Sequence, residues 1–444
     1  MNTHDAIARA AVTRGIVARR DRSSFRRAFA TLMVLWVLVF AVVIVAAIQA
    51  SSYSQAAAGR DALARVRAHW AARAGVEAAI ARVEYETENP DEQDPLRLSE
   101  ELELIGENSL DGARFKVDAP AGGDAHRKFN VNRMTREQFL LFPDMTEDIA
   151  DSILDWIDTD DDSRPLGAER GFYAAQAYPY VPRNGPLRSI AELELIFGCS
   201  PELVRGEDWN LNGRLDPSED DGDASWPDDN ADGVLDAGWS ALMTTASVDG
   251  GYAASGQPRL DLRSAAADDV TRRVGLAPDQ AQVIITHASG AAATMGDFIR
   301  RTLSQLSQEQ ALRPANLTNE ELGTLLNECE IGAASAGAPG KLNINTCEAE
   351  ALQYLPDITP GLADAIIFDR ASRPSGYRSV ADLLNVPAMS RNRLSRIAQS
   401  LDVRSNTFVI SSRGRDDRTA LEAELVVVID RSTLPATIAE VRRP

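Results

Sequence analysis

One stretch of twelve residues carries oxygen-bearing groups at the alternating positions that a calcium loop requires. It runs from Asp208 to Glu219 and has glycine, Gly213, at its sixth position. Calcium takes six to eight oxygen ligands, which such a loop supplies from positions 1, 3, 5, 7, 9 and 12. Those positions hold Asp208, Asn210, Asn212, Arg214 (through its carbonyl), Asp216 and Glu219. The spacing predicts a Ca2+ site, with a solvated acidic loop as the alternative.

A second loop of the same kind follows shortly afterwards. Its first, third, fifth, seventh and ninth positions hold Asp228, Asn230, Asp232, Val234 (carbonyl) and Asp236. Position 12 is Trp239, which cannot bind a metal, so either water or another acid such as Asp221 or Asp223 completes this site, or the loop binds Ca2+ weakly. Too few residues separate the loops for the helices of a paired EF-hand. They therefore predict structural ions and not a calcium sensor.

Other residue sets give weaker chemical signals. A third acidic run, formed by Asp155, Asp158, 160–162 and Glu169, has the residue types for a cation site, although such runs are usually solvated. The four histidines are scattered, and no catalytic triad, phosphate-binding loop or dinucleotide fingerprint is evident. The sequence therefore predicts a protein that is not an enzyme.

The three cysteines do not form a disulfide framework or a zinc site. A single bridge between Cys329 and Cys347 fits an oxidising compartment. Two free buried thiols are the alternative interpretation. The cysteines therefore add little to the prediction of function.

An apolar segment near the N-terminus predicts a membrane span. Residues 28–48 are almost uninterruptedly apolar, and no charged residue lies between Arg27 and Arg60. Residues 1–27 hold seven arginines against two aspartates, which predicts a cytoplasmic N-terminus and an exported remainder. A cleaved signal peptide is the alternative, with Ala47 and Ala50 as its small residues. We expect a single-pass inner-membrane protein with a periplasmic ectodomain.

The apolar segment is expected to continue as one helix from about residue 28 to 86, because Ala and Arg are strong helix formers. Alternating residues predict strands at 113–117, 407–411 and 421–429, with Arg413-Gly414-Arg415 as turn material between the last two. The long helix would pack on a small antiparallel sheet made by these strands. The middle of the chain would then be an insertion.

The insertion contains an internal repeat. Lys128-Phe129-Asn130-Val131-Asn132 recurs as Lys341-Leu342-Asn343-Ile344-Asn345, and 142–146 recurs as 355–359. A degenerate copy begins at Arg259-Leu260-Asp261-Leu262. Each copy is typical of a helix, a tight turn and a second helix, which is a helix–hairpin–helix.

Such hairpins bind DNA backbones when glycine amides at the turn meet phosphates. Here the corresponding positions hold Asp144 and Thr146 in one copy and Asp357 and Thr359 in the other. An aspartate repels phosphate, and the formal net charge of −20 disfavours nucleic acid generally. The repeats therefore predict packing modules.

The predicted organisation follows the chain in order. It comprises a basic leader (1–27), a transmembrane half-helix (28–49), a periplasmic helix with the first strand (50–120), copy 1 (128–205), a calcium-loop segment (206–240), degenerate copy 2 (255–335), copy 3 (341–403) and the C-terminal strands (406–431).

With these parts assigned, the chain resembles the K-class minor pseudopilins of bacterial type II secretion systems. The resemblance rests on 34–38, 130–132, 343–346, 155–162 and 184–187 leading to 190–193. It implies an α+β fold with a pilin-like core and a large, mostly helical inserted domain of helix–hairpin–helix (SAM-like) repeats. It also implies calcium in the inserted domain and a non-enzymatic role at the tip of a periplasmic pseudopilus, aiding export of folded proteins with other minor pseudopilins as partners.

The resemblance implies processing by a prepilin peptidase, which usually cuts after glycine, but no glycine stands directly before the apolar segment. Aligning Trp36 with the family pattern places the cut after Ala28 and makes Phe29 the first mature residue. The fifth mature residue would be Met33, and K-class members also lack the usual glutamate there. Two other functions remain open: a membrane-anchored helix–hairpin–helix DNA receptor of the competence type, and a calcium-dependent adhesion or scaffold protein.

Overall fold

The computed structural model describes residues 4–119, 123–226, 228–307, 314–332 and 337–443, with side chains from residue 29 onward. The chain divides into two compact units, residues 1–66 and 67–444. The described part of the first unit is entirely helical. The second unit contains the sheet and the repeated helical modules.

Helix α1 runs from His4 to Glu88, so it begins well before the expected residue 28. The leader continues the helix because Ala and Arg favour helical backbone and no proline interrupts it. The helix ends just before Asn89-Pro90, as expected from the clash between a proline ring and the preceding helical residue. From Phe29 onward it is long and apolar enough to cross a membrane, by length and composition.

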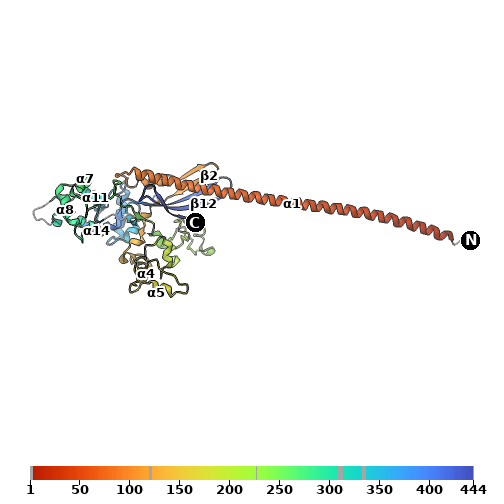
Figure 1. Cartoon of the computed structure of the whole chain (residues 1–444), viewed down its shortest axis with the longest axis horizontal. Coiled ribbons are helices and arrows are strands. Elements are labelled where there is room, and N and C mark those ends of the chain that lie inside the picture. Colours follow the sequence, from red (N-terminus) through yellow and green to blue (C-terminus); the bar gives the residue numbers. More distant parts are fainter. Residues whose placement is uncertain (1–3, 120–122, 227, 308–313, 333–336, 444) are drawn as a thin grey trace. The chain divides into compact units, whose positions relative to one another are not determined.

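Five antiparallel strands form the main sheet in the order β1-β2-β11-β12-β13. Two of them, β2 and β12, are labelled in Figure 1. Their bounds are β1 Glu107–Leu110, β2 Ala113–Asp118, β11 Thr407–Asp416, β12 Glu422–Asp430 and β13 Thr437–Arg442. The sheet joins strands from opposite ends of the inserted region. The expected α+β fold, with a long helix and a small antiparallel sheet, is therefore confirmed.

Within the second unit, the end of α1 packs on this sheet through small and branched side chains. Ala72, Val76 and Val83 are fully buried and share a hydrophobic cluster with Phe408 and Val427. Alanine on the helix allows its backbone to approach the strands closely. Burial of this apolar surface is the main force that fixes the helix on the sheet.

The prediction of a turn at Arg413-Gly414-Arg415 was wrong. These residues lie inside β11, and the chain reverses later, between Asp416 and Glu422. A Cβ atom at Gly414 would lie 1.9 Å from the carbonyl oxygen of Ala68 and 2.3 Å from the backbone nitrogen of Ala72. The glycine is there because helix backbone crosses directly over the strand and leaves no room for a side chain.

The inserted region, which lies within the second compact unit, contains three helical units that share one plan. In each, a short leading strand pairs in parallel with a closing strand that follows the helices. The pairs are β3 (Phe129–Asn130) with β4 (Met243–Thr244), β6 (Leu260–Asp261) with β7 (Cys329–Glu330), and β9 (Leu342–Asn343) with β10 (Leu401–Asp402). The calcium-loop segment therefore lies inside the first unit, before its closing strand.

Helices make up most of the chain that connects the two paired strands of each helical unit. The first unit holds α3 Arg136–Phe139, α4 Glu147–Ile157, α5 Arg170–Ala174, the 3-10 helix η4 Ile190–Leu195 and α6 Pro201–Arg205. The second holds α7 Ala267–Val274, α8 Pro278–Ala288, α9 Met295–Arg300, α10 Leu303–Leu306 and α11 Asn319–Glu328. The third holds α12 Ala349–Gln353, α13 Pro360–Ala371, η7 Val380–Asn385 and α14 Arg391–Ile397. All three contribute to one continuous hydrophobic core.

The remaining described elements are short and connect these parts. They are α2 Arg97–Glu103, η2 Ala125–Arg127, η3 Val131–Arg133, η5 Gly222–Ala224, η6 Gly238–Ala241, η8 Ala398–Ser400, and the paired strands β5 Val248–Asp249 and β8 Ala338–Pro339.

The hairpin turns adopt left-handed backbone at residues that are not glycine. Asp144 has φ 58°, Asp357 has φ 61° and Ala388 has φ 69°. Aspartate tolerates this conformation, but alanine is strained in it by roughly 1–2 kcal/mol.

We expect Ala388→Gly to stabilise the chain by about 1 kcal/mol, measured by the denaturant midpoint. As a control, Ala365→Gly inside α13 should destabilise it by about 1 kcal/mol. A loss of stability in Ala388→Gly would contradict the strain.

An ion pair joins the second and third helical units. Arg259 donates to Asp402 at 2.8 Å and also lies 3.4 Å from Asp249. Burial alone would raise the pKa of Asp402, but Arg259 and Lys341 outweigh it and hold the pKa at about 2. A lowered folded-state pKa stabilises the fold above the unfolded value and loses that contribution as pH falls through the folded one.

We expect Asp402→Asn to destabilise the chain by about 2 kcal/mol at pH 7, because Arg259 loses its main partner. The difference from wild type should shrink as pH falls from about 4 toward 2. Denaturant titrations of both proteins at pH 7 and pH 3 measure it. An Asp364→Asn control, at an exposed site in α13, should match wild type at both values; a pH-independent difference for Asp402→Asn would refute the charge argument.

All three cysteines are free and buried, so the bridge between Cys329 and Cys347 is absent from the structure. Burial raises the pKa of both thiols to about 12. Each therefore packs as a small apolar side chain in the core, which agrees with the alternative drawn from the sequence.

Candidate metal centre

The first calcium loop folds around its own predicted ligands. Asp208 accepts hydrogen bonds from the backbone nitrogens of Asn212 and Gly213, at 2.9 and 3.0 Å. The side-chain amides of Asn210 and Asn212 both donate to Asp216, at 2.9 and 2.8 Å. Asp208, Asn210, Asn212 and Asp216 are therefore held close together by hydrogen bonds within the loop.

Glu219 closes this loop. Its two carboxylate oxygens accept from the backbone nitrogens of Trp209 and Asp216, both at 3.0 Å. Asp208 and Glu219 are almost fully buried, and this burial raises the pKa of each carboxyl group. Buried carboxylates with raised pKa values favour a cation nearby. The donor set fits Ca2+, although its ligation stays a prediction.

The second loop repeats the backbone of the first. Leu211 and Gly213 have positive φ in the first loop, and Ala231 and Gly233 occupy the same two positions with φ 50° and 77°. Asn230 donates its side-chain amide to Asp236 at 3.1 Å, and the backbone of Val234 donates to Asp232 at 2.8 Å. Asp228, Asn230, Asp232, Val234 and Asp236 are all exposed. The shared backbone supports a second loop of the same type.

Glu207, which was not among the acids expected to complete the second loop, bonds the backbone of that loop. Glu207 accepts from the backbone nitrogens of Asn230 and Asp236, both at 3.1 Å, and is buried. Asp221 instead bonds Ser225. Glu207 immediately precedes Asp208 in the chain, so each loop is closed by an acid at an edge of the first loop. This role of Glu207 could be recognised only from the tertiary structure.

Three contacts fasten the loops to the rest of the second unit. Trp239, the twelfth residue of the second loop, is buried and donates its indole nitrogen to the carbonyl of Pro143 at 2.9 Å. Arg214 lies 3.2 Å from Glu424 on β12, and Arg442 on β13 donates to the carbonyl of Leu211 at 3.0 Å. The loops are therefore tied to the first hairpin and to the sheet.

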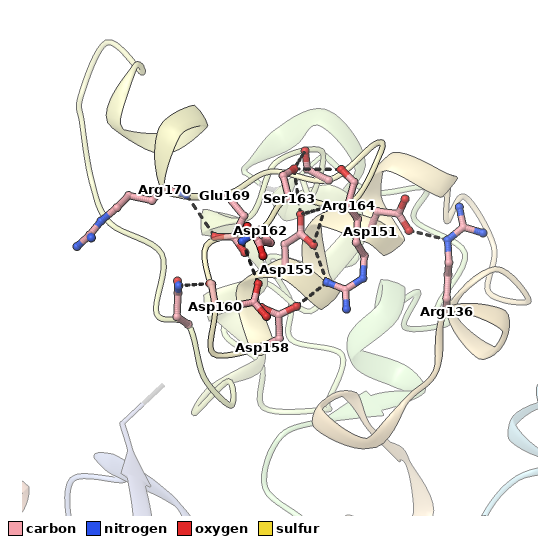
Figure 2. Close-up of polar contacts among 12 residues, drawn as sticks. Arg136, Asp151, Asp155, Asp158, Asp160, Asp162, Ser163, Arg164, Glu169 and Arg170 are labelled. Atoms are coloured by element: carbon pink, nitrogen blue, oxygen red, sulfur yellow. Dashed lines mark hydrogen bonds and ion pairs between the residues drawn. The ribbon is translucent and has the colours of Figure 1, made fainter.

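The third acidic run forms the tightest carboxylate cluster among the described residues. Oxygen atoms of Asp155, Asp158 and Glu169 lie within 4.8 Å of one another. Figure 2 shows these three side chains turned toward one another, with Arg164 beside them. Arg164 lies 2.6 Å from both aspartates. Its guanidinium compensates part of their charge, and Glu169 is left outside that pairing.

Several oxygens in this cluster have no partner among the described residues. Oδ1 of Asp158, Oε1 of Glu169 and Oδ1 of Asn184 are buried and accept no hydrogen bond. Burial, together with the nearby carboxylates of Asp155, Asp158 and Asp161, raises the pKa of Glu169 to about 7. Unpaired buried oxygens are costly, and hard cations prefer oxygen ligands. The cluster therefore fits a calcium-type cation.

The other predicted site residues lie in α1. Phe29 is exposed on that helix, and the side chain of Ala28 lies outside the described residues. Cleavage between them stays a prediction. The residues that sequence reasoning missed are Glu207 and Asn184, which reach their sites from separate segments.

Two family descriptions match parts of this chain. Residues 128–206 match the family described as type II secretion system (T2SS), protein K. Residues 338–402 match the helix-hairpin-helix motif. The second match confirms the helix–hairpin–helix expected in the third unit. The first contains Asp155, Asp158 and Glu169 but ends before the calcium loops.

Relatives point in the same direction. The type II secretion system protein K of Pectobacterium carotovorum subsp. carotovorum is 32% identical over 132 residues, which is 23% of this chain and 39% of that protein. The match thus spans about two fifths of the relative's length. A chain in the crystal structure of the GspK-GspI-GspJ complex from enterotoxigenic Escherichia coli aligns with a TM-score of 0.45 and 15% identity, covering 87% of this chain and 99% of that one.

The resemblance to the K-class minor pseudopilins is confirmed by the protein K family match and by the relative. The protein K family match lies in the first helical unit.

Proposed function

We propose that this K-class minor pseudopilin is anchored in the inner membrane by α1 and assembles with other minor pseudopilins at the tip of a type II secretion pseudopilus. The observation that carries the proposal is the protein K match over 128–206, in a chain whose N-terminal helix is apolar enough to span a membrane. In this role the protein is a structural component that aids export of folded proteins. It performs no catalysis.

The proposed topology places the arginine-rich leader in the cytoplasm and the second unit in the periplasm. The charge distribution supports it, because seven arginines precede the apolar segment while the whole chain carries −20. A prepilin peptidase would cut between Ala28 and Phe29. Mass spectrometry of the membrane-extracted protein tests the cut, since a mature chain beginning at Phe29 is expected.

Co-purification tests the assembly. The full chain, extracted in mild detergent, should carry the other minor pseudopilins of its own secretion system with it, and deletion of its gene should abolish secretion by that system. Restoration by the wild-type gene is the control. Normal secretion in the deletion strain would refute the proposed role and would favour a calcium-dependent adhesion or scaffold protein, which needs no secretion partners.

We also propose that Ca2+ binds in the inserted region and stiffens it for assembly. Asp208, Asn210, Asn212, Asp216 and Glu219 would hold one ion, with the carbonyl of Arg214. The second loop, closed by Glu207, would hold another. The cluster of Asp155, Asp158 and Glu169 has unpartnered buried oxygens that support a further ion. Bound calcium would supply charge neutralisation and cross-linking of loops.

The competence-type DNA receptor is not favoured. Asp357, at the first hairpin turn of the third unit, lies 2.9 Å from Arg396. The ion pair leaves these two side chains with no net positive charge to attract a phosphate. Binding of the full chain to duplex DNA at physiological salt would reverse this ranking.

A further inference from the structure

A polar cavity of about 160 Å³ lies where the end of α1, the loop around Tyr252 and the segments around Arg404 and Arg431 meet. All of these belong to the second unit. Pro90, Tyr252 and Leu434 supply apolar lining, and Tyr252 and Leu434 are about half exposed. A space of this size accommodates a molecule of roughly benzene dimensions.

Arginines dominate the charged lining. The cavity is lined by three arginines, Arg259, Arg404 and Arg431, and by two acids, Glu86 and Asp402. Both acids already have ion partners. Asp402 pairs with Arg259 at 2.8 Å, and Glu86 lies 3.2 Å from Arg97, which is outside the lining. Arg404 and Arg431 are therefore the two charges left over.

Arg404 has only a neutral contact among the described residues. Its Nη2 donates to the carbonyl of Asp91, while its buried Nε has no acceptor. Asp91, Glu92, Asp94 and Asp402 favour its charge from farther away, yet burial lowers its pKa. A partly buried guanidinium without a direct anionic partner carries a desolvation cost that no ion pair offsets.

Arg431 also lacks a direct anionic partner among the described residues. Its Nε donates to the carbonyl of Ser405 at 2.9 Å, and its guanidinium lies over the ring of Phe408. Within the described part of the chain, no carboxylate oxygen lies within 4.0 Å of its nitrogens. Burial and the positive charge of Arg404 lower its pKa to about 10, with Asp124 and Glu86 opposing that effect. The two guanidiniums line the same cavity, and the charge of Arg404 disfavours the charge of Arg431.

The balance of charge indicates what would fill the space. Asp402 is paired with Arg259 and Glu86 with Arg97, so an anion in the cavity would meet the two remaining guanidiniums, those of Arg404 and Arg431. Guanidiniums prefer planar oxyanions, which they bind through paired hydrogen bonds. The apolar lining adds room for a small aliphatic group. The overall charge of −20 means that attraction of an anion must come from this cavity and not from the general field.

We propose that this cavity binds a single carboxylate bearing a small apolar group, held between Arg404 and Arg431. A free branched-chain fatty acid and the C-terminal carboxylate of a polypeptide share this chemistry. The proposal is independent of the assembly role, because it rests on the cavity alone.

Titration of the full chain in detergent tests the site. The probes are 3-methylbutanoate, its neutral amide 3-methylbutanamide, and acetyl-Gly-Ala-Leu with either a free or an amidated C-terminus. We expect saturable calorimetric binding of the carboxylates and no binding of the neutral amides. Tighter binding of the free-ended peptide than of 3-methylbutanoate would assign the site to a chain terminus; the reverse would assign it to a small acid.

Two variants guard against misfolding as an explanation. Arg404→Gln and Arg431→Gln should each weaken binding of the carboxylates at least tenfold. Arg404 makes only one described hydrogen bond, so its variant is expected to fold normally even if loss of the Phe408 contact unfolds the other. Arg415→Gln, which removes an exposed arginine paired with Glu422, should bind as wild type does. Equal binding of acid and amide, no binding of either, or equal weakening in Arg415→Gln would overturn the proposal.

Discussion

Replacing Gly414 with valine is expected to destabilise the chain by at least about 3 kcal/mol, or to prevent folding of the second unit. Gly414 pairs with Phe115 on one side and Ala423 on the other, in the middle of the sheet. A Cβ there meets the carbonyl of Ala68 at 1.9 Å. Because the obstacle is helix backbone, no rotamer change relieves it, and the helix must move off the strand.

The measurement is the denaturant midpoint of the detergent-extracted full chain, followed by tryptophan fluorescence. Gly361→Ala is the matched control, because a Cβ at Gly361 meets nothing within 4 Å and that residue lies in α13. The control should be neutral or stabilising by up to about 1 kcal/mol. A valine at 414 that leaves the midpoint unchanged would show that α1 does not cross the strand as described.

Ca2+ is expected to raise the unfolding temperature of the chain after chelator treatment. At a hundredfold excess over its dissociation constant, one ion stabilises the folded state by about 2.7 kcal/mol. The physical reason is the burial of Asp208, Glu219 and Glu169. Burial disfavours the charged form of each carboxyl group and so raises its pKa. Neutralising that charge removes a penalty of the folded state.

Variants separate the sites, provided the calcium response and not the absolute stability is compared. Asp208→Ala should remove the contribution of the first loop, and Glu169→Gln that of the carboxylate cluster. Asp364→Ala, at an exposed position of α13, should respond as wild type does. Scanning calorimetry with and without calcium gives the answer. An unchanged unfolding temperature in the wild-type chain would rule out every calcium site proposed above.

Local spacing predicted the parts of the candidate centre that are contiguous in the chain. Asp208 to Glu219 form a loop because their own side chains bond their own backbone, as the positions of Gly213 and the asparagines indicate. Glu207 was missed because its function depends on where Asn230 and Asp236 return in space. The acidic run of Asp155, Asp158 and Glu169 was interpreted as a solvated surface, because its burial depends on how other segments pack against it.

In the fold too, the parts with a local signal in the sequence were the ones that could be predicted. Alternation gave the strands at Ala113 and Thr407, and self-comparison gave the hairpins. The error at Gly414 arose because glycine has two uses, freedom of backbone and absence of bulk, and a single sequence does not separate them. The start of α1 at His4 was missed because the arginine-rich leader was interpreted by charge alone.

The parallel pairing of leading and closing strands has a consequence for how such a chain changes over generations. Adjacent strands lie about 4.8 Å apart, so each helical unit returns the backbone to within a strand's width of its departure point, heading the same way. A whole unit can therefore be gained, lost or enlarged with little disturbance to what precedes and follows it. In the first helical unit, the loops at 208–219 and 228–239 lengthen the chain before the closing strand Met243–Thr244, and that strand still pairs with Phe129–Asn130.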